Sequence, residues 1–241
     1  MPCAVQSLWI GDRLSKLEQL SIRSFLANGH EFHLYTYHPM QGIPPGTIHH
    51  DGNEILPASM IFRDQDIGSF SGFADLFRYK LLRERGGWWV DLDIVCMRPL
   101  TDPEEYAFAL EAPGYLGNCV LFSRPASLAI EYLWNVARKK DPTRLFWCEI
   151  GPPLVQEAVD RFELQRCVMP AATFCPIPSS LWFDTFVPGR GTEIGDDSLG
   201  VHFWHEMWRR ARLDKDEDYG PRSLYERLKA KYGLRNGTTH R

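Results

Sequence analysis

The stretch GGWWVDLDIVC, residues Gly86 to Cys96, lies before the middle of a chain of 241 residues. Its apolar and aromatic residues are typical of a buried β-strand, yet it carries Asp91 and Asp93 one residue apart. Burying a carboxylate costs free energy unless the group is paired or bound to a metal. The stretch therefore predicts a strand that delivers two acids to a ligand or a cation. The plain alternative is two solvated acids at a strand end.

A helix is predicted directly before this strand, over about residues 72–85. Phe73, Leu76, Phe77 and Leu81 recur at helical spacing and form one apolar stripe, and a Gly-Gly pair follows the last turn. The chain thus passes from a helix, through a sharp turn, into the strand with the two acids.

The first forty residues predict a strand, a helix and a second strand. Residues 4–10 are largely apolar, Ser15 and Glu18 have the spacing of a capping box, and residues 30–37 alternate polar and apolar. This order is a βαβ unit, which favours a parallel sheet. We expect a single α/β domain with a Rossmann-like, mostly parallel central sheet flanked by helices. Other expected elements are a loop-rich segment over 39–68, a strand over 115–123, helices over 125–140, 151–162 and 222–232, and an extended segment over 167–177.

Composition places the chain among ordinary globular proteins, with 44% hydrophobic and 24% charged residues. A net charge of -4 gives no reason to expect nucleic acid as a partner. None of the six cysteines falls in a CxxC pair, which argues against a zinc ribbon and favours a reduced, cytoplasmic protein. The N-terminus lacks the pattern of a signal peptide. Peripheral attachment to the inner face of a membrane is left open.

The spacing of the two acids suggests a metal. Residues i and i+2 of a strand share a face, so Asp91 and Asp93 are predicted to lie beside Trp89, about 6.5–7 Å apart. Two carboxylates on one face repel each other unless a cation or a hydrogen-bond donor lies between them. At the carboxyl end of a strand in an open α/β sheet, they would lie where such sheets bind ligands. Carboxylates of this kind suit Mn²⁺ or Mg²⁺.

The segment FADLFRYKLLRERGGWWVDLDIVCMRPL resembles the central motif of the DxD retaining glycosyltransferases. This group, of the GT-A type and similar to family 32, includes initiating mannosyltransferases, α-1,4-galactosyl and N-acetylglucosaminyl transferases, capsular polysaccharide transferases and, more distantly, clostridial glucosylating toxins. Ile150 and Met207 depart from the Thr and Ser of the family's pattern. Further segments that resemble family motifs, covering with this one roughly residues 5–208, are Ser7–Gly11, Gly117–Leu121, Gly151-Pro152 and Val201–Trp208.

The resemblance implies a nucleotide-sugar donor, a divalent metal and a saccharide or glycolipid acceptor. By the family pattern Asp93 would bind Mn²⁺ or Mg²⁺ directly, and Asp91 would accept hydrogen bonds from donor hydroxyls and contact the metal through water. His202 is the further candidate metal ligand, with His205 as its competitor. The implied organisation is a nucleotide-binding half over about 1–100, an acceptor-side half over about 101–215, and a C-terminal helix and tail over 216–241.

The resemblance also assigns five donor-binding residues, and each has a plain structural alternative. Trp9 would stack on the nucleobase or simply pack in the core. Asp75 would bind sugar hydroxyls and Arg78 the donor sugar or phosphate, but the two could equally form an ion pair one helical turn apart. Asn118 would bind sugar hydroxyls or belong to a turn. Trp208 would donate its indole N–H to a phosphate or lie in the aromatic core.

The predicted activity is metal-dependent, retaining transfer of a hexose or N-acetylhexosamine from a UDP- or GDP-sugar, as in polysaccharide biosynthesis. Asp91, Asp93 and Arg78 are the candidate catalytic residues, with no covalent nucleophile; Glu149 is a weak candidate for supporting the reacting face. One alternative is a haloacid-dehalogenase-type phosphatase. The stretch after Val90 also fits the DxDx(T/V) motif of that class, and residues 194–197 resemble its late acidic motif. That fold places its nucleophile on the first strand. The other is a sugar-binding module without catalysis.

Overall fold

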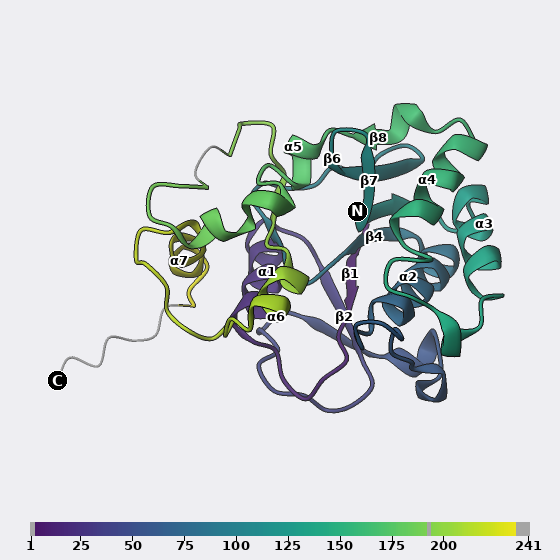
Figure 1. Ribbon diagram of the computed structural model, residues 1–241, viewed down its shortest axis with the longest axis horizontal. Coiled ribbons are helices and arrows are strands. Elements are labelled where there is room, and N and C mark those ends of the chain that lie inside the picture. Colours follow the sequence, from purple (N-terminus) through teal and green to yellow (C-terminus); the bar gives the residue numbers. More distant parts are fainter. Residues whose placement is uncertain (1–2, 192–193, 235–241) are drawn as a thin grey trace.

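A seven-stranded sheet runs through the centre of the protein, with strand order β3-β2-β1-β4-β7-β6-β8 (Figure 1). The computed structural model describes residues 3–191 and 194–234. The pairs β1–β2, β2–β3, β1–β4 and β6–β8 are parallel, whereas β4–β7 and β6–β7 are antiparallel. The strands are β1 Val5–Leu8, β2 Phe32–Thr36, β3 Ile48–Asp51, β4 Gly87–Val90, β6 Tyr106–Ala112, β7 Tyr115–Ser123 and β8 Val168–Met169.

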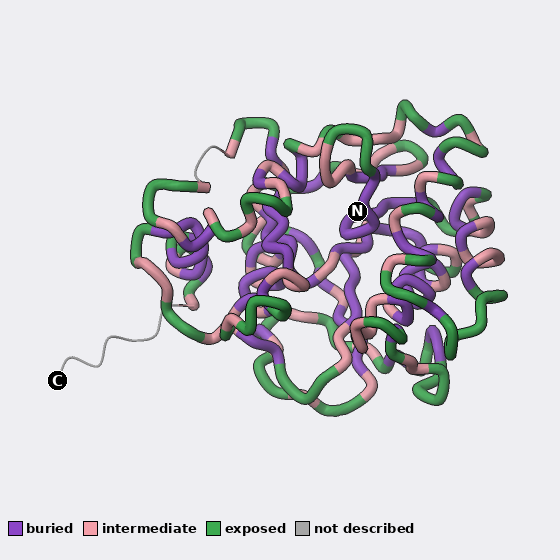
Figure 2. The backbone as a smooth tube through the Cα atoms, in the orientation of Figure 1, coloured by how far each residue is buried: buried purple, intermediate pink, exposed green. Residues whose placement is uncertain are grey.

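Helices cover both faces of this sheet. Apolar side chains of α2, α3 and α4 pack on one face, and those of α1 and α5 pack on the other. Figure 2 shows the result, in which buried chain runs through the centre and exposed loops form the rim. The predicted α/β class, with a mostly parallel sheet flanked by helices, is confirmed. The helices are α1 Lys16–Ala27, α2 Ser71–Arg85, α3 Leu128–Ala137, α4 Pro152–Arg161, α5 Ala171–Phe174, α6 His205–Ala211 and α7 Leu224–Lys231.

The prediction of one strand over residues 86–96 is wrong, because the chain turns at the two acids. The backbone N–H of Asp91 donates to the Cys119 carbonyl at 2.8 Å and is the last link to β7. The N–H of Ile94 then donates to the Asp91 carbonyl at 3.0 Å, which closes a turn. Aspartates favour such turns. Asp91 and Asp93 therefore follow the carboxyl end of β4 and do not share a strand face.

Beyond this turn the chain enters a second sheet. Strand β5, Ile94–Cys96, pairs antiparallel with β9, Gly200–His202. These two strands form a sheet of their own. The turn at the acids is thus the point where the chain leaves the central sheet and joins the C-terminal part of the protein.

Three further segments differ from prediction. The segment expected to be loop-rich holds β3, an edge strand whose sequence IHHD is mostly exposed and lacks apolar alternation. Strand β6 was not predicted. The segment expected to be extended over 167–177 contains β8 and the short helix α5. No helix in the described part of the chain is long and apolar enough to cross a membrane.

Candidate functional site

The pairing of β5 with β9 brings Asp93 to His202. Ile94 lies opposite His202 in the register, so the residue before Ile94 reaches the end of β9. His202 Nε2 lies 3.1 Å from Asp93 Oδ2, and the backbone N–H of His205 donates to the same oxygen at 2.7 Å. Asp93 and His202 are both buried. The predicted metal ligands Asp93 and His202 thus lie together although 109 residues separate them in the chain.

A second cluster forms around Arg78 on α2. Arg78 Nη2 lies 3.2 Å from Asp75 Oδ1 and 3.2 Å from Asp91 Oδ1, and Nη1 donates to the Asn118 carbonyl. Asn118 Nδ2 in turn donates to Asp75 Oδ1 at 2.7 Å. The guanidinium also lies 4.7 Å from the ring of Trp89. Because protein groups hold its guanidinium, Arg78 acts in this structure as a positioning residue, and its contact with a donor stays a prediction.

One cavity of about 560 Å³ joins the two clusters. It opens at the carboxyl ends of β1 and β4, where open α/β sheets bind ligands. Trp9, directly after β1, forms part of its wall, and the Trp9 indole N–H donates to the Arg13 carbonyl at 3.0 Å. Of the predicted site residues, the cavity is lined by Trp9, Asp75, Arg78, Asp91, Asp93, Asn118, His202 and His205.

Trp208 and Glu149 lie outside this cavity. The Trp208 side chain is buried among aromatic rings of the C-terminal part, and its indole N–H donates to the Phe203 carbonyl at 2.6 Å. The Trp208 N–H is thus used within the protein, as the core alternative expects, and its contact with a donor phosphate stays a prediction. Glu149 pairs with Lys140 at 3.0 Å and is absent from the cavity wall.

Burial and neighbouring charges give the carboxyl groups of the site different pKa values. Burial would raise the pKa of Asp93, but the charge and hydrogen bond of His202 and the His205 N–H outweigh it and lower that pKa. Burial raises the pKa of Asp91, although Arg78 opposes this. Burial also raises the pKa of Asp75 to about 7 against the nearby Arg78 charge. The free protein therefore keeps Asp93 ionised, and although burial would lower the pKa of His202, the Asp93 carboxylate raises it well above its usual value.

Replacing Asp75 by asparagine should flatten the dependence of stability on pH between about pH 4 and about pH 7. The folded protein holds the Asp75 proton up to about pH 7, whereas the unfolded chain releases it near pH 4. The native state therefore binds more protons in this window, and the free energy of unfolding falls as pH rises. Urea unfolding across the window measures the slope. Asp197→Asn, an exposed control, should keep it; an Asp75→Asn variant with the full slope contradicts the assignment.

Glu111, on β6, is a cavity residue that sequence reasoning missed. Its carboxylate makes no hydrogen bond or ion pair with another described residue, and burial raises its pKa. The Glu111 side chain packs over Gly117, where any other residue would place a Cβ only 2.4 Å from Glu111 Cγ. The only signal in the sequence was this glycine opposite an acid on a neighbouring strand. Trp147, half-exposed at the cavity wall, was missed as well.

Two cavity-lining residues that are not glycine have left-handed backbone conformations. These are Cys148, with φ of 65°, and Trp204, with φ of 53°. Such conformations cost of the order of 1–3 kcal/mol each and persist where the surrounding structure enforces them. The Trp204 ring packs on His202 with centroids 4.0 Å apart, and its indole N–H donates to the Ile177 carbonyl at 2.9 Å. Packing and hydrogen bonding thus hold the strained Trp204 against the imidazole.

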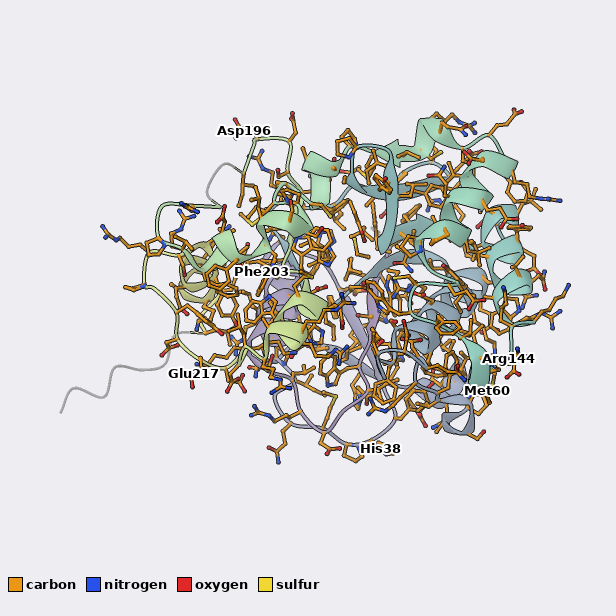
Figure 3. All side chains as sticks on the ribbon, in the orientation of Figure 1. His38, Met60, Arg144, Asp196, Phe203 and Glu217 are labelled. Carbon is orange, nitrogen blue, oxygen red and sulfur yellow. The ribbon has the colours of Figure 1, made fainter. Side chains whose placement is uncertain are left out.

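The residues of the phosphatase alternative do not come together. Asp91 and Asp93 follow β4 and not the first strand. Asp196 projects from the rim of the molecule (Figure 3) and pairs with Arg98 at 2.9 Å. Neither Asp196 nor Asp197 lines the cavity. The late acidic motif therefore supplies no group to the candidate site.

Comparisons with known proteins find similar structures but no family. No protein-family model matches the chain, and no curated protein matches it. The galactosyltransferase LgtC in complex with donor and acceptor sugar analogs is 12% identical, covers 98% of each chain and has a TM-score of 0.49. The PaToxG glycosyltransferase is 17% identical over 67% of this chain and 70% of its own, with a TM-score of 0.49. The glycosyltransferase GlyE of Streptococcus pneumoniae is 14% identical over 98% of this chain and 61% of its own, with a TM-score of 0.43.

Proposed function

We propose that this protein is a metal-dependent glycosyltransferase that moves a hexose or N-acetylhexosamine from a UDP- or GDP-sugar to an acceptor hydroxyl with retention. The observation that supports this most is the meeting of Asp91, Asp93 and His202 in one cavity at the carboxyl end of β4. Together with the motif resemblance, this arrangement favours a family 32-like enzyme.

The arrangement of Asp93 and His202 fits a divalent cation. Two neighbouring ligands about 2.0–2.1 Å from an octahedral ion lie about 3 Å apart. The separation of 3.1 Å between Asp93 Oδ2 and His202 Nε2 is close to that value. Asp91, whose side chain is partly exposed to the cavity, would contact the ion through water. When bound, Mn²⁺ or Mg²⁺ would neutralise the charge that develops on the departing diphosphate.

The remaining residues would hold the donor. Trp9 would stack on the base, because it lines the cavity directly after β1 and its N–H is used by Arg13. The Asp75 carboxyl would accept hydrogen bonds from sugar hydroxyls, and the Asn118 amide would donate hydrogen bonds to them. Arg78 would hold the carboxylates of Asp75 and Asp91 in place. With no carboxylate assigned as a covalent nucleophile, the acceptor hydroxyl would attack from the face that the nucleoside diphosphate leaves.

Glu111 and Trp147 would serve the acceptor. An unpaired carboxylate inside a cavity can accept a hydrogen bond from a hydroxyl, and an exposed indole can stack on a sugar ring. Both residues lie on the part of the chain after β5, whereas Trp9 and Asp75 come before it. A saccharide or a glycolipid, as in polysaccharide biosynthesis, would fit this combination.

A thermal-shift screen of UDP- and GDP-sugars tests the proposal. One donor class should raise the melting temperature with Mn²⁺ present and not with a chelator, as expected for a ligand that binds only the folded state. The same donor should be hydrolysed slowly to the nucleoside diphosphate. Mg²⁺-dependent cleavage of an aryl phosphate, with no stabilisation by any nucleotide sugar, would favour the phosphatase instead. Stabilisation without any turnover or transfer would indicate the binding module.

A further inference from the structure

Two buried cysteine thiols lie behind His202, on the side of the ring away from Asp93. Cys119 belongs to β7, and Cys175 directly follows α5. Cys119 Sγ, Cys175 Sγ and one ring nitrogen of His202 all lie within 4.8 Å of one another. Cys175 Sγ is 3.7 Å from His202 Nδ1. All three residues are buried, and neither cysteine lines the cavity.

We propose that Cys119, Cys175 and His202 Nδ1 form a binding site for a thiophilic divalent cation, of which Zn²⁺ is the representative. Tetrahedral zinc with Zn–S of about 2.3 Å and Zn–N of about 2.0–2.1 Å separates a sulfur from a nitrogen by about 3.5 Å. The observed separation of Cys175 Sγ and His202 Nδ1 is 3.7 Å, so this pair needs almost no movement. Three protein ligands leave one position for a water, as in open zinc sites.

Asp93 prepares the imidazole for this role. His202 Nε2 faces Asp93 Oδ2 at 3.1 Å, and a proton on Nε2 leaves the lone pair of Nδ1 directed at the thiols. A carboxylate behind a histidine ligand fixes the ring and its tautomer in many zinc proteins. The other ring contact, with Trp204, holds the plane of the imidazole.

The charges also favour a divalent ion. The ligands of zinc are thiolates and a neutral imidazole, so binding would release the protons that these groups carry on the two Sγ atoms and on Nδ1. Two thiolates, one neutral imidazole and one divalent cation sum to zero. A neutral complex avoids the cost of leaving a net charge in the buried space between β7, α5 and β9. A monovalent ion in the same ligand set would leave one negative charge there.

One consequence rests on the proposed function. The same imidazole would hold Mn²⁺ through Nε2 in the cavity and Zn²⁺ through Nδ1 at the thiols. A neutral imidazole has a single lone pair for a metal, so the two ions would exclude each other at His202. Zinc bound to Nδ1, on the edge of the His202 ring away from the cavity, would then inhibit the enzyme.

Titration of the reduced full-length protein with Cd²⁺ tests the site, because a thiolate bound to cadmium gives an ultraviolet charge-transfer band. One equivalent should produce the band, and excess Zn²⁺ should remove it. Cys119→Ser and Cys175→Ser should each weaken binding at least tenfold. Cys96→Ser is the matched control, because Cys96 is also buried but lies on β5 with its thiol donating to the Arg98 carbonyl. This variant should bind as the wild type does.

A band that survives in both serine variants would overturn the proposal, as would the absence of any band in the wild type. If a serine variant fails to fold, zinc X-ray absorption of the wild-type protein decides: two sulfur neighbours and a nitrogen support the site, and a shell of oxygen alone refutes it. Donor binding with Mn²⁺ in folded Cys175→Ser reports on the proposed function separately. Loss of the cadmium band with donor binding intact leaves both proposals standing.

Discussion

Replacing Asp93 by asparagine should weaken Mn²⁺-dependent donor binding by on the order of 100-fold, since a bound metal contributes several kcal/mol to holding a diphosphate. The amide keeps the shape of the side chain and can still accept the hydrogen bond from the His205 N–H. It lacks the negative charge that a divalent cation needs. Isothermal calorimetry with the donor found by the thermal screen measures the effect, and Asp93→Ala should abolish binding.

The control for this experiment is Asp197→Asn, which removes one exposed carboxylate outside the cavity. It should bind the donor as the wild type does. Circular dichroism and the melting temperature without donor must show that Asp93→Asn is folded. If folded Asp93→Asn binds the donor with unchanged affinity, Asp93 is not a metal ligand and the proposed role of the turn after β4 is wrong.

Replacing Arg78 by methionine should lower the free energy of unfolding by about 3–5 kcal/mol, as expected when one partner of a buried ion pair is removed. The guanidinium lies 3.2 Å from a carboxylate oxygen of Asp75 and of Asp91, and the variant leaves both acids without this cation. Urea unfolding at neutral pH measures the loss.

Arg83→Met is the matched control on the same helix. Arg83 pairs with Glu131, and both side chains are 38% exposed, so solvent screens this pair and its loss should destabilise the protein far less than the loss of Arg78. Equal losses for Arg78→Met and Arg83→Met would show that the buried cluster does not depend on its guanidinium. The same pair of variants separates stability from binding, since only the Arg78 change should alter donor affinity in the folded fraction.

The sequence predicted elements well where local signals are strong. Strand β7 has the predicted bounds Tyr115–Ser123, and α2 stops before Gly86, whose φ of 64° suits a glycine. The break between β4 and β5 was missed because apolar residues continue through Leu92 into Ile94 on both sides of the turn. The hydrophobic pattern does not show where a strand stops pairing with its neighbour. Here the pairing of β4 with β7 ends at the backbone hydrogen bond from Asp91 to Cys119.

Much of the candidate site followed from motifs, but its contacts between distant segments did not. The resemblance selected His202, and only the pairing of β5 with β9 shows why it meets Asp93. Trp9 and Trp208 both donate their indole N–H to a backbone carbonyl, and the difference between them is that Trp9 lines the cavity whereas Trp208 is buried outside it. The lack of a CxxC pair argued against a zinc ribbon, and Cys119 and Cys175 are far apart in the sequence. The fold, and no local pattern, brings their thiols together.

The junction of β5 with β9 has a consequence for a chain that is still being synthesised. While the ribosome has completed β4 and β5 but not β9, the two acids exist without His202, and β5 has no partner strand. Contacts between residues 109 positions apart form late, because a long loop must close first. A nascent chain should therefore be able to complete the central sheet, whose last strand in the chain is β8, before it acquires β9 and the meeting of Asp93 with His202. Synthesis of β9, and not formation of the central sheet, would complete the candidate site.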